Sequence, residues 1–503
     1  MAGDLFATIM ERVGNLDAPF LETIHGKVTT YRDFLAQSAR FANALRVAGV
    51  RADDRVLVQV EKSREALALY VACIRAGAIF VPLNSAYTIR ELEYFIADAD
   101  PALIVCRPSN HNVVQRSAQP RPCLTLDEQG GGSLAELAAR QPGSFADTEC
   151  QPDDIAALLY TSGTTGRAKG AMLSHGNLIS NAETLVEAWR FTPTDTLIHA
   201  LPIFHTHGLF VATNVVLFAA ARMLFLPKFD SEEILRLMPR ATVMMGVPTF
   251  YVRLLQHPGL SDEICQNMRL FISGSAPLLP ETHRSWRLKT GHSILERYGM
   301  TETNMNTSNP YDGERVPGTV GFPLPNIEVR VSDPETGTPC APGEVGVIEV
   351  KGPNVFRGYW RNPEKTKTEF RQDGFFMTGD LGWFDERGYL HIVGRVKDLI
   401  ITGGYNVYPR EVELELDTLP GVLESAVIGL PHLDYGEAVT AFLVSDGSVP
   451  LTEEEVLKAL RTRLARFKQP KRVLLLQSLP RNAMGKVQKE KLRQEYRLLY
   501  SAG

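Results

Sequence analysis

Short apolar runs alternate with longer helical patterns from Tyr31 to Ser273. Runs of four to eight apolar residues are typical of strands buried on both faces, and the segments between them have the spacing of amphipathic helices. Strands separated by helices pair in parallel, because each crossover returns the chain to the same edge of the sheet. We therefore expect an α/β fold with parallel sheets covered by helices. The expected strands include Val56–Val60, Ile79–Leu83, Ala102–Cys106, Ile155–Tyr160, Thr196–Leu201, Arg222–Leu226, Val243–Val247 and Leu270–Ser273.

The pattern changes after Asn309, where turn residues become dense and the expected strands become short. Such a segment is typical of a small antiparallel β unit. The last hundred or so residues mix strands with helices and fit a separate small α+β domain. A chain of 503 residues is also too long for one compact core. We predict an N-terminal part at 1–394 with a β-rich portion at about 310–394, a hinge at 395–397 and a mobile C-terminal domain at 398–503.

Composition excludes several classes of protein. The net charge is −5 with both signs interspersed, so nothing suggests a nucleic-acid-binding surface. Six cysteines without a Cys-x-x-Cys pair argue against a structural zinc site or a disulfide framework. The longest apolar stretch, 215–226, contains Arg222 and is too short to cross a membrane. We expect a cytoplasmic protein that binds small molecules and neither nucleic acid nor membrane, as a monomer or weak homodimer.

A loop rich in glycine and hydroxyl groups follows the expected strand Ile155–Tyr160. Glycines let the backbone turn tightly and present its N–H groups, and the hydroxyls and cations add donors for a triphosphate. The loop is not a Walker motif, because Lys169 is followed by Gly170 instead of Ser or Thr. A flexible surface turn is the alternative. The candidate phosphate-binding residues are Thr161, Ser162, Gly163, Thr164, Thr165, Gly166 and Lys169.

Five further motifs follow in order: Gly274–Pro277, Tyr298–Glu302, Thr378–Asp380, Gly394–Asp398 and Pro480–Lys486. With the loop, they resemble the adenylate-forming superfamily of acyl-CoA synthetases, peptide-synthetase adenylation domains and beetle luciferases. The resemblance spans residues from about 30 to 490 and implies ATP, Mg²⁺ and coenzyme A as cofactor and co-substrates.

The resemblance also implies roles for individual residues. Glu302 would hold Mg²⁺, Thr301 would contact the α-phosphate, and Lys486 would stabilise the charge of the adenylation transition state. Lys397 would be the hinge, and Gly403 and Gly404 would let coenzyme A pass close to the backbone. A surface carboxylate, a solvated lysine and a strand-ending glycine pair are the alternatives. The remaining nucleotide-binding candidates are Ser275, Ala276, Pro277, Glu296, Arg297, Tyr298, Gly299, Met300, Asp380 and Arg395.

The resemblance places the acid-binding pocket at 201–209, 274–276 and 300–308. Polar residues in these segments favour a short acid with a second polar end. His205, His207 and Ser275 are candidate contacts, Met305 is a candidate floor, and Arg284 is a candidate partner for a second carboxylate. Arg284 on a solvated helix face is the alternative.

The strings around His205 and Met305 resemble those of bacterial malonyl-CoA synthetases, which implies a malonate:CoA ligase. Alternatives are a ligase for methylmalonate, oxalate or a short-chain fatty acid, and an adenylation enzyme that loads a carrier protein.

Overall fold

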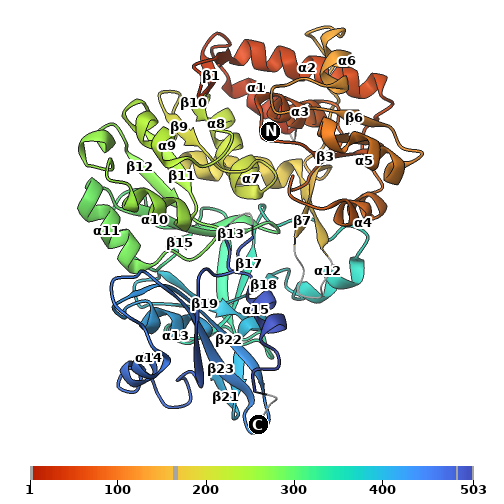
Figure 1. The fold of residues 1–503 in the computed structure, drawn as a ribbon. Coiled ribbons are helices and arrows are strands. Elements are labelled where there is room, and N and C mark those ends of the chain that lie inside the picture. The colour runs from red at the N-terminus through yellow and green to blue at the C-terminus, as the bar shows by residue number, and fades with distance from the viewer. Residues whose placement is uncertain (1–3, 162–167, 483–484, 501–503) are drawn as a thin grey trace. The chain divides into compact units, whose positions relative to one another are not determined.

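The computed structural model describes residues 4–161, 168–482 and 485–500. The chain forms two compact units (Figure 1). The first unit consists of Met1–Pro317, Gly321–Glu328 and Val350–Phe376, and the second of Gly318–Val320, Val329–Glu349 and Met377–Gly503.

A six-stranded sheet lies in the N-terminal half of the first unit, in the order β6-β5-β3-β4-β7-β8. Its neighbours are parallel except β7 and β8, which form an antiparallel pair. The predicted phosphate loop connects these two strands. The strands are β3 (Arg55–Gln59), β4 (Ile79–Pro82), β5 (Leu103–Cys106), β6 (Cys123–Thr125), β7 (Ile155–Thr161) and β8 (Lys169–Ser174).

A nine-stranded sheet follows, in the order β15-β14-β13-β12-β11-β9-β10-β1-β2. Its central strands from β13 to β1 are parallel, and antiparallel strands flank them on both sides. The strands are β1 (Pro19–Thr23), β2 (Val28–Thr30), β9 (Thr196–His199), β10 (Arg222–Phe225), β11 (Val243–Gly246), β12 (Leu270–Ser273), β13 (Ile294–Met300), β14 (Asn304–Ser308) and β15 (Phe322–Pro323).

Helices cover these sheets, and side-chain caps fix several of their starts. Ser63 accepts the N–H of Ala66 at the start of α3, and Thr88 with Glu91 forms a capping box on α4. The helices are α1 (Leu5–Arg12), α2 (Tyr31–Val47), α3 (Arg64–Arg75), α4 (Ile89–Ala99), α5 (His111–Ala118), α6 (Ser133–Ala139), α7 (His175–Ala188), α8 (Asn214–Phe218), α9 (Ser231–Leu237), α10 (Pro248–Gln256), α11 (Pro280–Thr290) and α12 (Pro363–Glu369). A π-helix spans His207–Thr213 and runs into α8.

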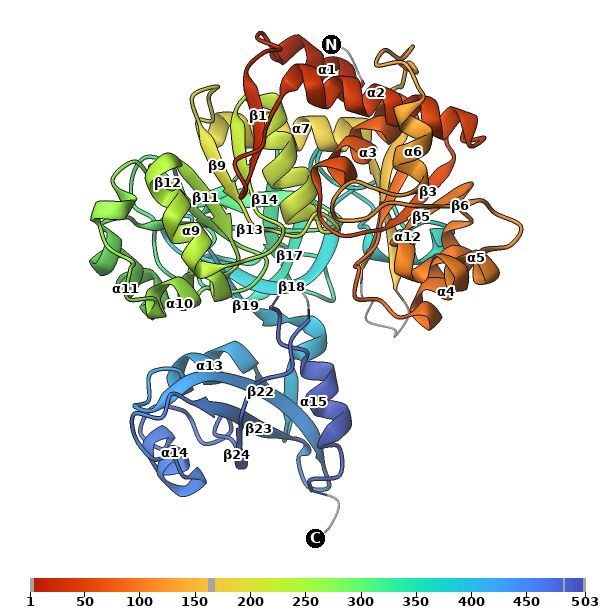
Figure 2. The same ribbon diagram turned by 45° about the horizontal axis from the view of Figure 1, so that its top comes forward.

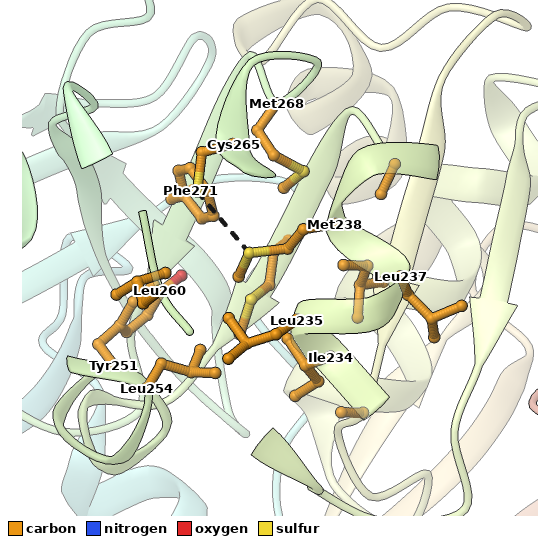
Figure 3. Close-up of a cluster of buried hydrophobic side chains, with 14 of the residues drawn as sticks. Ile234, Leu235, Leu237, Met238, Tyr251, Leu254, Leu260, Cys265, Met268 and Phe271 are labelled. Carbon is orange, nitrogen blue, oxygen red and sulfur yellow. Dashed lines mark hydrogen bonds between the residues drawn. The ribbon is translucent and has the colours of Figure 1, made fainter. Parts of the chain in front are cut away.

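A hydrophobic cluster joins helices α9, α10 and α11 to the nine-stranded sheet (Figure 3). Ile234 and Leu254 from the helices pack with Met244 and Phe271 from β11 and β12. Trp286 of α11 is fully buried in the same cluster. Fully burying one large apolar side chain contributes about 1.5–3 kcal/mol, so these contacts stabilise the packing of the three helices on the sheet.

Two smaller sheets form the second unit. The first has the order β16-β17-β18-β19, and β18 and β19 are antiparallel. In the second, β22 and β23 form a long antiparallel pair, with α13 and α14 packed on one face and α15 on the other (Figure 2). The elements are β16 (Glu328–Ser332), β17 (Gly346–Lys351), β18 (Phe376–Phe384), β19 (Leu390–Arg395), β20 (Ile400–Thr402), β21 (Tyr405–Val407), α13 (Pro409–Leu416), β22 (Val422–His432), β23 (Gly436–Ser445), α14 (Glu453–Leu460), β24 (Arg472–Leu476) and α15 (Lys489–Glu495).

The α/β fold class predicted from the alternating pattern is confirmed, as are the small antiparallel sheet and the α+β region near the C-terminus. The hinge at 395–397 stays a prediction. Within the described ranges, no helix is both long enough and apolar enough to cross a bilayer.

Candidate active site

Three predicted substrate-binding segments follow strands of the nine-stranded sheet. The segment at 205–209 follows β9, the turn Gly274–Pro277 follows β12, and β13 runs directly into the turn at 301–303. Strands β9 and β12 both pair with β11, and β13 pairs with β12. The carboxyl ends of parallel strands lie at the same edge of a sheet, where α/β proteins bind their ligands. This edge therefore brings the three segments together.

A polar cluster lies at this edge, and we call it the Arg297 cluster: the buried Thr206, His207, Ser273 and Arg297 with the half-buried Ser275. The Arg297 guanidinium lies against Gly274, since a Cβ atom there would come within 2.4 Å of Arg297 Cζ. Ser275 has a φ of 71°, and its Oγ lies 3.2 Å from His207 Nδ1. The turn needs glycine at 274 because a side chain would displace the arginine.

The Arg297 cluster has unusual electrostatics. Burial lowers the pKa of Arg297 to about 9. Burial and the nearby Arg297 charge also lower the pKa of His207 well below its usual value, so His207 is neutral. A guanidinium beside a neutral imidazole and hydroxyl groups suits a carboxylate, which accepts two parallel N–H bonds from arginine. The buried atoms with no hydrogen-bond partner in the described part of the chain include Thr206 Oγ1, His207 Nε2, Ser273 Oγ, and Nε and Nη2 of Arg297.

The other predicted acid-binding residues lie in different environments. Met305 is buried, and His205 is half-buried with its Nδ1 3.4 Å from the backbone nitrogen of His207. Arg284, in contrast, is exposed on α11, where 59% of its side chain is accessible and its Nη2 lies 3.2 Å from Glu281 Oε2. The structure does not bring Arg284 to the Arg297 cluster, because the buried face of α11 carries Trp286 and not Arg284.

A second polar group surrounds Glu302, which is buried after the end of β13. Thr161 Oγ1 donates to Glu302 Oε1 at 3.3 Å, and the Tyr359 hydroxyl lies 3.1 Å from the same oxygen and 2.6 Å from Glu369 Oε2. Burial and these two carboxylates raise the pKa of Tyr359. Lys169 lies 3.9 Å from Glu369 Oε1, and desolvation lowers the pKa of Lys169. Carboxylates beside the predicted phosphate loop fit a hard divalent cation.

The turn after β13 is held by groups that the sequence did not reveal. Asn354 Nδ2 donates to the carbonyl oxygens of Thr303 at 2.6 Å and Met305 at 3.3 Å. Asn181 Nδ2 of α7 also donates to the Met305 carbonyl oxygen, at 3.1 Å. Tyr359, Glu369, Asn181 and Asn354 come from distant parts of the chain, so no local pattern marks them.

The other predicted nucleotide-binding residues of the first unit lie on or beside β12 and β13. Glu296 and Tyr298 are buried within β13. Gly299 has no room for a side chain, since a Cβ atom would lie 1.9 Å from the Asn304 carbonyl oxygen. Met300 and Thr301 are half-buried, as is Ala276, and Pro277 is exposed. Ser162, Gly163, Thr164, Thr165 and Gly166 lie outside the described residues.

The second unit carries the remaining candidates. Asp380 and Arg395 face each other across β18 and β19, with 2.9 Å between Asp380 Oδ1 and Arg395 Nε. Lys397 is exposed in a short 3₁₀ helix, Val396–Asp398.

Gly403 and Gly404 form the two-residue turn between β20 and β21, with φ values of 56° and 82°. Such hairpin turns require positive φ at both positions, which glycine adopts without strain. Lys486 lies in the turn before α15, where its backbone nitrogen donates to Asn482 Oδ1 at 3.0 Å.

Comparisons with known proteins agree with this arrangement. The chain matches the AMP-binding enzyme family over residues 12–360 and the AMP-binding enzyme C-terminal domain over residues 411–486. The crystal structure of ATP-bound MatB from Rhodopseudomonas palustris is 58% identical, with a TM-score of 0.98 over 99% of this chain and 100% of that one. A malonate–CoA ligase of Arabidopsis thaliana is 38% identical over 87% of this chain and 79% of its own length. The mitochondrial malonate–CoA ligase of Mus musculus is 35% identical over 94% and 87%. The chain therefore belongs to the AMP-binding enzyme family, which confirms the resemblance seen in its motifs.

Proposed function

We propose that this chain is an ATP-dependent malonate:CoA ligase that forms malonyl-CoA, AMP and pyrophosphate through a malonyl-adenylate. The single observation that carries malonate is the Arg297 cluster, whose buried guanidinium lacks a partner for Nε and Nη2 among the described residues. A second carboxylate would supply that partner. The identity with two malonate–CoA ligases supports the same substrate.

The reaction proceeds in two steps. One malonate carboxylate attacks the α-phosphorus of ATP and pyrophosphate leaves. The thiol of coenzyme A then attacks the acyl carbon of the adenylate, loses its proton, and AMP leaves. Arg297 would hold the other carboxylate and so orient the reacting one, and orientation of this kind accounts for a large part of the barrier reduction in such reactions.

Glu302 is the proposed Mg²⁺ ligand. Its buried carboxylate, next to the Thr161 and Tyr359 hydroxyl groups, fits a hard cation. When bound, Mg²⁺ would offset the negative charge of the phosphates. Thr301 would donate to the α-phosphate, and Tyr298 would contact the adenine.

Lys486 and the remaining second-unit residues would divide the two steps. Lys486 would contact both the reacting carboxylate and the α-phosphate, where negative charge gathers during adenylation. Asp380 and Arg395 would bind the ribose. Rotation about Lys397 would then replace Lys486 with the Gly403–Gly404 turn, which would border the pantetheine arm of coenzyme A.

The experiment that tests the function is AMP release across a panel of short acids, with free coenzyme A as the acceptor. Malonate should be used far better than acetate, oxalate, butyrate or octanoate, and thioester should form on free coenzyme A. A parent enzyme that prefers butyrate, or that needs a carrier protein, would contradict the proposal. Methylmalonate in the same panel measures the tolerance for a branched acid.

A further inference from the structure

Lys62 connects the two sheets of the first unit at their carboxyl ends. It follows β3 of the six-stranded sheet and reaches His199, the last residue of β9 in the nine-stranded sheet. Lys62 Nζ donates to the His199 carbonyl oxygen at 2.8 Å and lies 3.0 Å from His199 Nδ1. The ammonium group also lies 4.3 Å from the centre of the Phe225 ring, at the end of β10. These partners hold a lysine whose desolvation lowers its pKa well below its usual value.

His199 also contacts the segment that contains His207. His199 Nε2 lies 2.9 Å from the carbonyl oxygen of Gly208, which can only accept a hydrogen bond. The proton must therefore be on Nε2, and Nδ1 of the neutral ring must be the acceptor for Lys62. Burial and the Lys62 charge lower the pKa of His199, which keeps the ring neutral. The two ring contacts together specify one orientation of the imidazole.

The contact with the Gly208 carbonyl oxygen connects the oriented His199 ring to the candidate active site. Its carbonyl oxygen also accepts from Thr213 Oγ1 at 2.9 Å, within the π-helix His207–Thr213. There is no space for the backbone to move toward Pro202, since a Cβ atom on Gly208 would lie 2.0 Å from the Pro202 carbonyl oxygen. π-Helical turns are rare in proteins, and those that occur are often found at functional sites. His207, the first residue of this turn, is a member of the Arg297 cluster.

We propose that Lys62 is a positioning residue for the acid substrate: through His199 and the Gly208 carbonyl, it sets the position of His207 against the Arg297 guanidinium. This inference rests on the proposed function. Lys62 does not touch the acid itself, so its loss should weaken the use of malonate without weakening the use of ATP.

The test is a comparison of Lys62→Met with Lys289→Met. Methionine keeps an apolar stem beside Phe225 but cannot donate to His199. Lys289 is a matched control, because its Nζ also donates to two backbone carbonyl oxygens, those of Leu255 and His257, and neither belongs to the Arg297 cluster. Both variants should lose some melting temperature. Lys62→Met should raise the malonate KM by about tenfold or more, the size of one hydrogen bond to a charged group, and leave the ATP KM within about twofold. Lys289→Met should leave both KM values unchanged.

A double-mutant cycle with His207→Ala separates positioning from general support. If Lys62 acts through His207, Lys62→Met should have little further effect on the malonate KM once His207 is alanine. The proposal would be overturned if the two substitutions raised the malonate KM by independent factors that multiply in the double variant. It would also be overturned by an unchanged malonate KM in folded Lys62→Met or by equal changes in the malonate and ATP KM values.

A second variant decides the matter if Lys62→Met does not fold. Thr213→Val is nearly isosteric and removes the hydroxyl that donates to Gly208 and lies 3.3 Å from His199 Nε2, so it should raise the malonate KM alone, by a smaller factor. No change in that KM would then refute the proposed chain of contacts. The parent enzyme is assayed first. If it does not use malonate, the proposed function fails by itself, and the same comparison is made with the acid that it does use.

Discussion

Replacing Arg297 with methionine should make the enzyme a poorer catalyst without making it less stable. Arg297 is 3% exposed, and its pKa of about 9 reflects the loss of water around its charge. A buried charge without a counter-charge destabilises a fold by several kcal/mol, on the order of magnitude seen for such groups in proteins. Methionine has a similar length and no charge. We therefore expect the melting temperature of the unliganded variant to equal or exceed that of the parent.

The effect on catalysis should be large and opposite in sign. Truncating one partner of a buried charge pair costs about 2–5 kcal/mol, which corresponds to a loss of roughly 30-fold to several thousand-fold in kcat/KM for malonate. Malonate should also stop raising the melting temperature, because ligand stabilisation depends on binding to the folded state. AMP release and thermal unfolding with and without malonate measure both quantities.

Arg284→Met is the matched control for this experiment. Arg284 is exposed beside Glu281. Its replacement should therefore leave kcat/KM for malonate unchanged and change the free energy of unfolding by no more than about 0.5 kcal/mol, the usual range for surface substitutions. The reasoning fails if Arg297→Met keeps malonate activity within about threefold of the parent while Arg284→Met loses it. A fall of several degrees in the melting temperature of Arg297→Met with unchanged kinetics would make Arg297 purely structural.

Three further outcomes are expected. Glu302→Gln should shift the Mg²⁺ dependence of adenylation to higher concentrations, because a neutral amide is a poorer ligand for a hard cation; unchanged activity at limiting Mg²⁺ would remove Glu302 from the metal site. Lys486→Ala should lose adenylation by a factor of about 10² or more yet still convert supplied malonyl-AMP and coenzyme A to the thioester; equal loss of both steps would contradict the division proposed above. Burial lowers the pKa of His199 and His207 well below the usual value of about 6.5, so the unfolded chain binds protons that the folded one does not, and the free energy of unfolding should fall as the pH drops below about 6.5. Urea titrations at several pH values measure this slope, and His207→Asn should reduce it.

The alternation of apolar runs and helices was sufficient to predict the fold class, because each signal is local. Gly403 and Gly404 were expected to border coenzyme A, with a strand-ending glycine pair as the alternative; they form the turn of a hairpin, and their role toward coenzyme A stays a prediction. The phosphate loop and the Glu302 turn were found as motifs, since their residues are neighbours in the chain.

The prediction for Arg284 did not take into account which face of its helix is buried. It lies a few residues after the predicted pocket turn Gly274–Pro277, but Trp286 of the same helix is the large apolar side chain that faces the core. Positions 284 and 286 are about 200° apart on a helix of 3.6 residues per turn, so Arg284 faces solvent. Arg297, by contrast, was a candidate for the nucleotide, and its burial against Gly274 becomes visible only in the structure.

Other site residues depend on contacts that no local pattern contains. Lys62 and His199 are 137 positions apart, and Tyr359 and Glu302 are 57 apart. Asn354 reaches carbonyl groups in the turn after β13 from the segment that precedes α12. Such pairs become visible only once the sheets and loops are placed in space.

Strand β13 and the turn after it keep Arg297 and Glu302 at a fixed spacing along the backbone. Arg297 and Glu302 belong to one continuous segment, and Asn354 and Asn181 donate to the carbonyl groups of Thr303 and Met305 just after Glu302. The charge proposed for the acid and the charge proposed for the metal therefore cannot move apart independently. A dicarboxylate with one more methylene, such as succinate, would have its second carboxylate displaced by more than 1 Å relative to the first, and misplacement of that size costs about 10²-fold in rate. Discrimination by chain length then follows from the spacing of Arg297 and Glu302 along this segment, and side-chain changes elsewhere around the acid would alter which branched malonates fit.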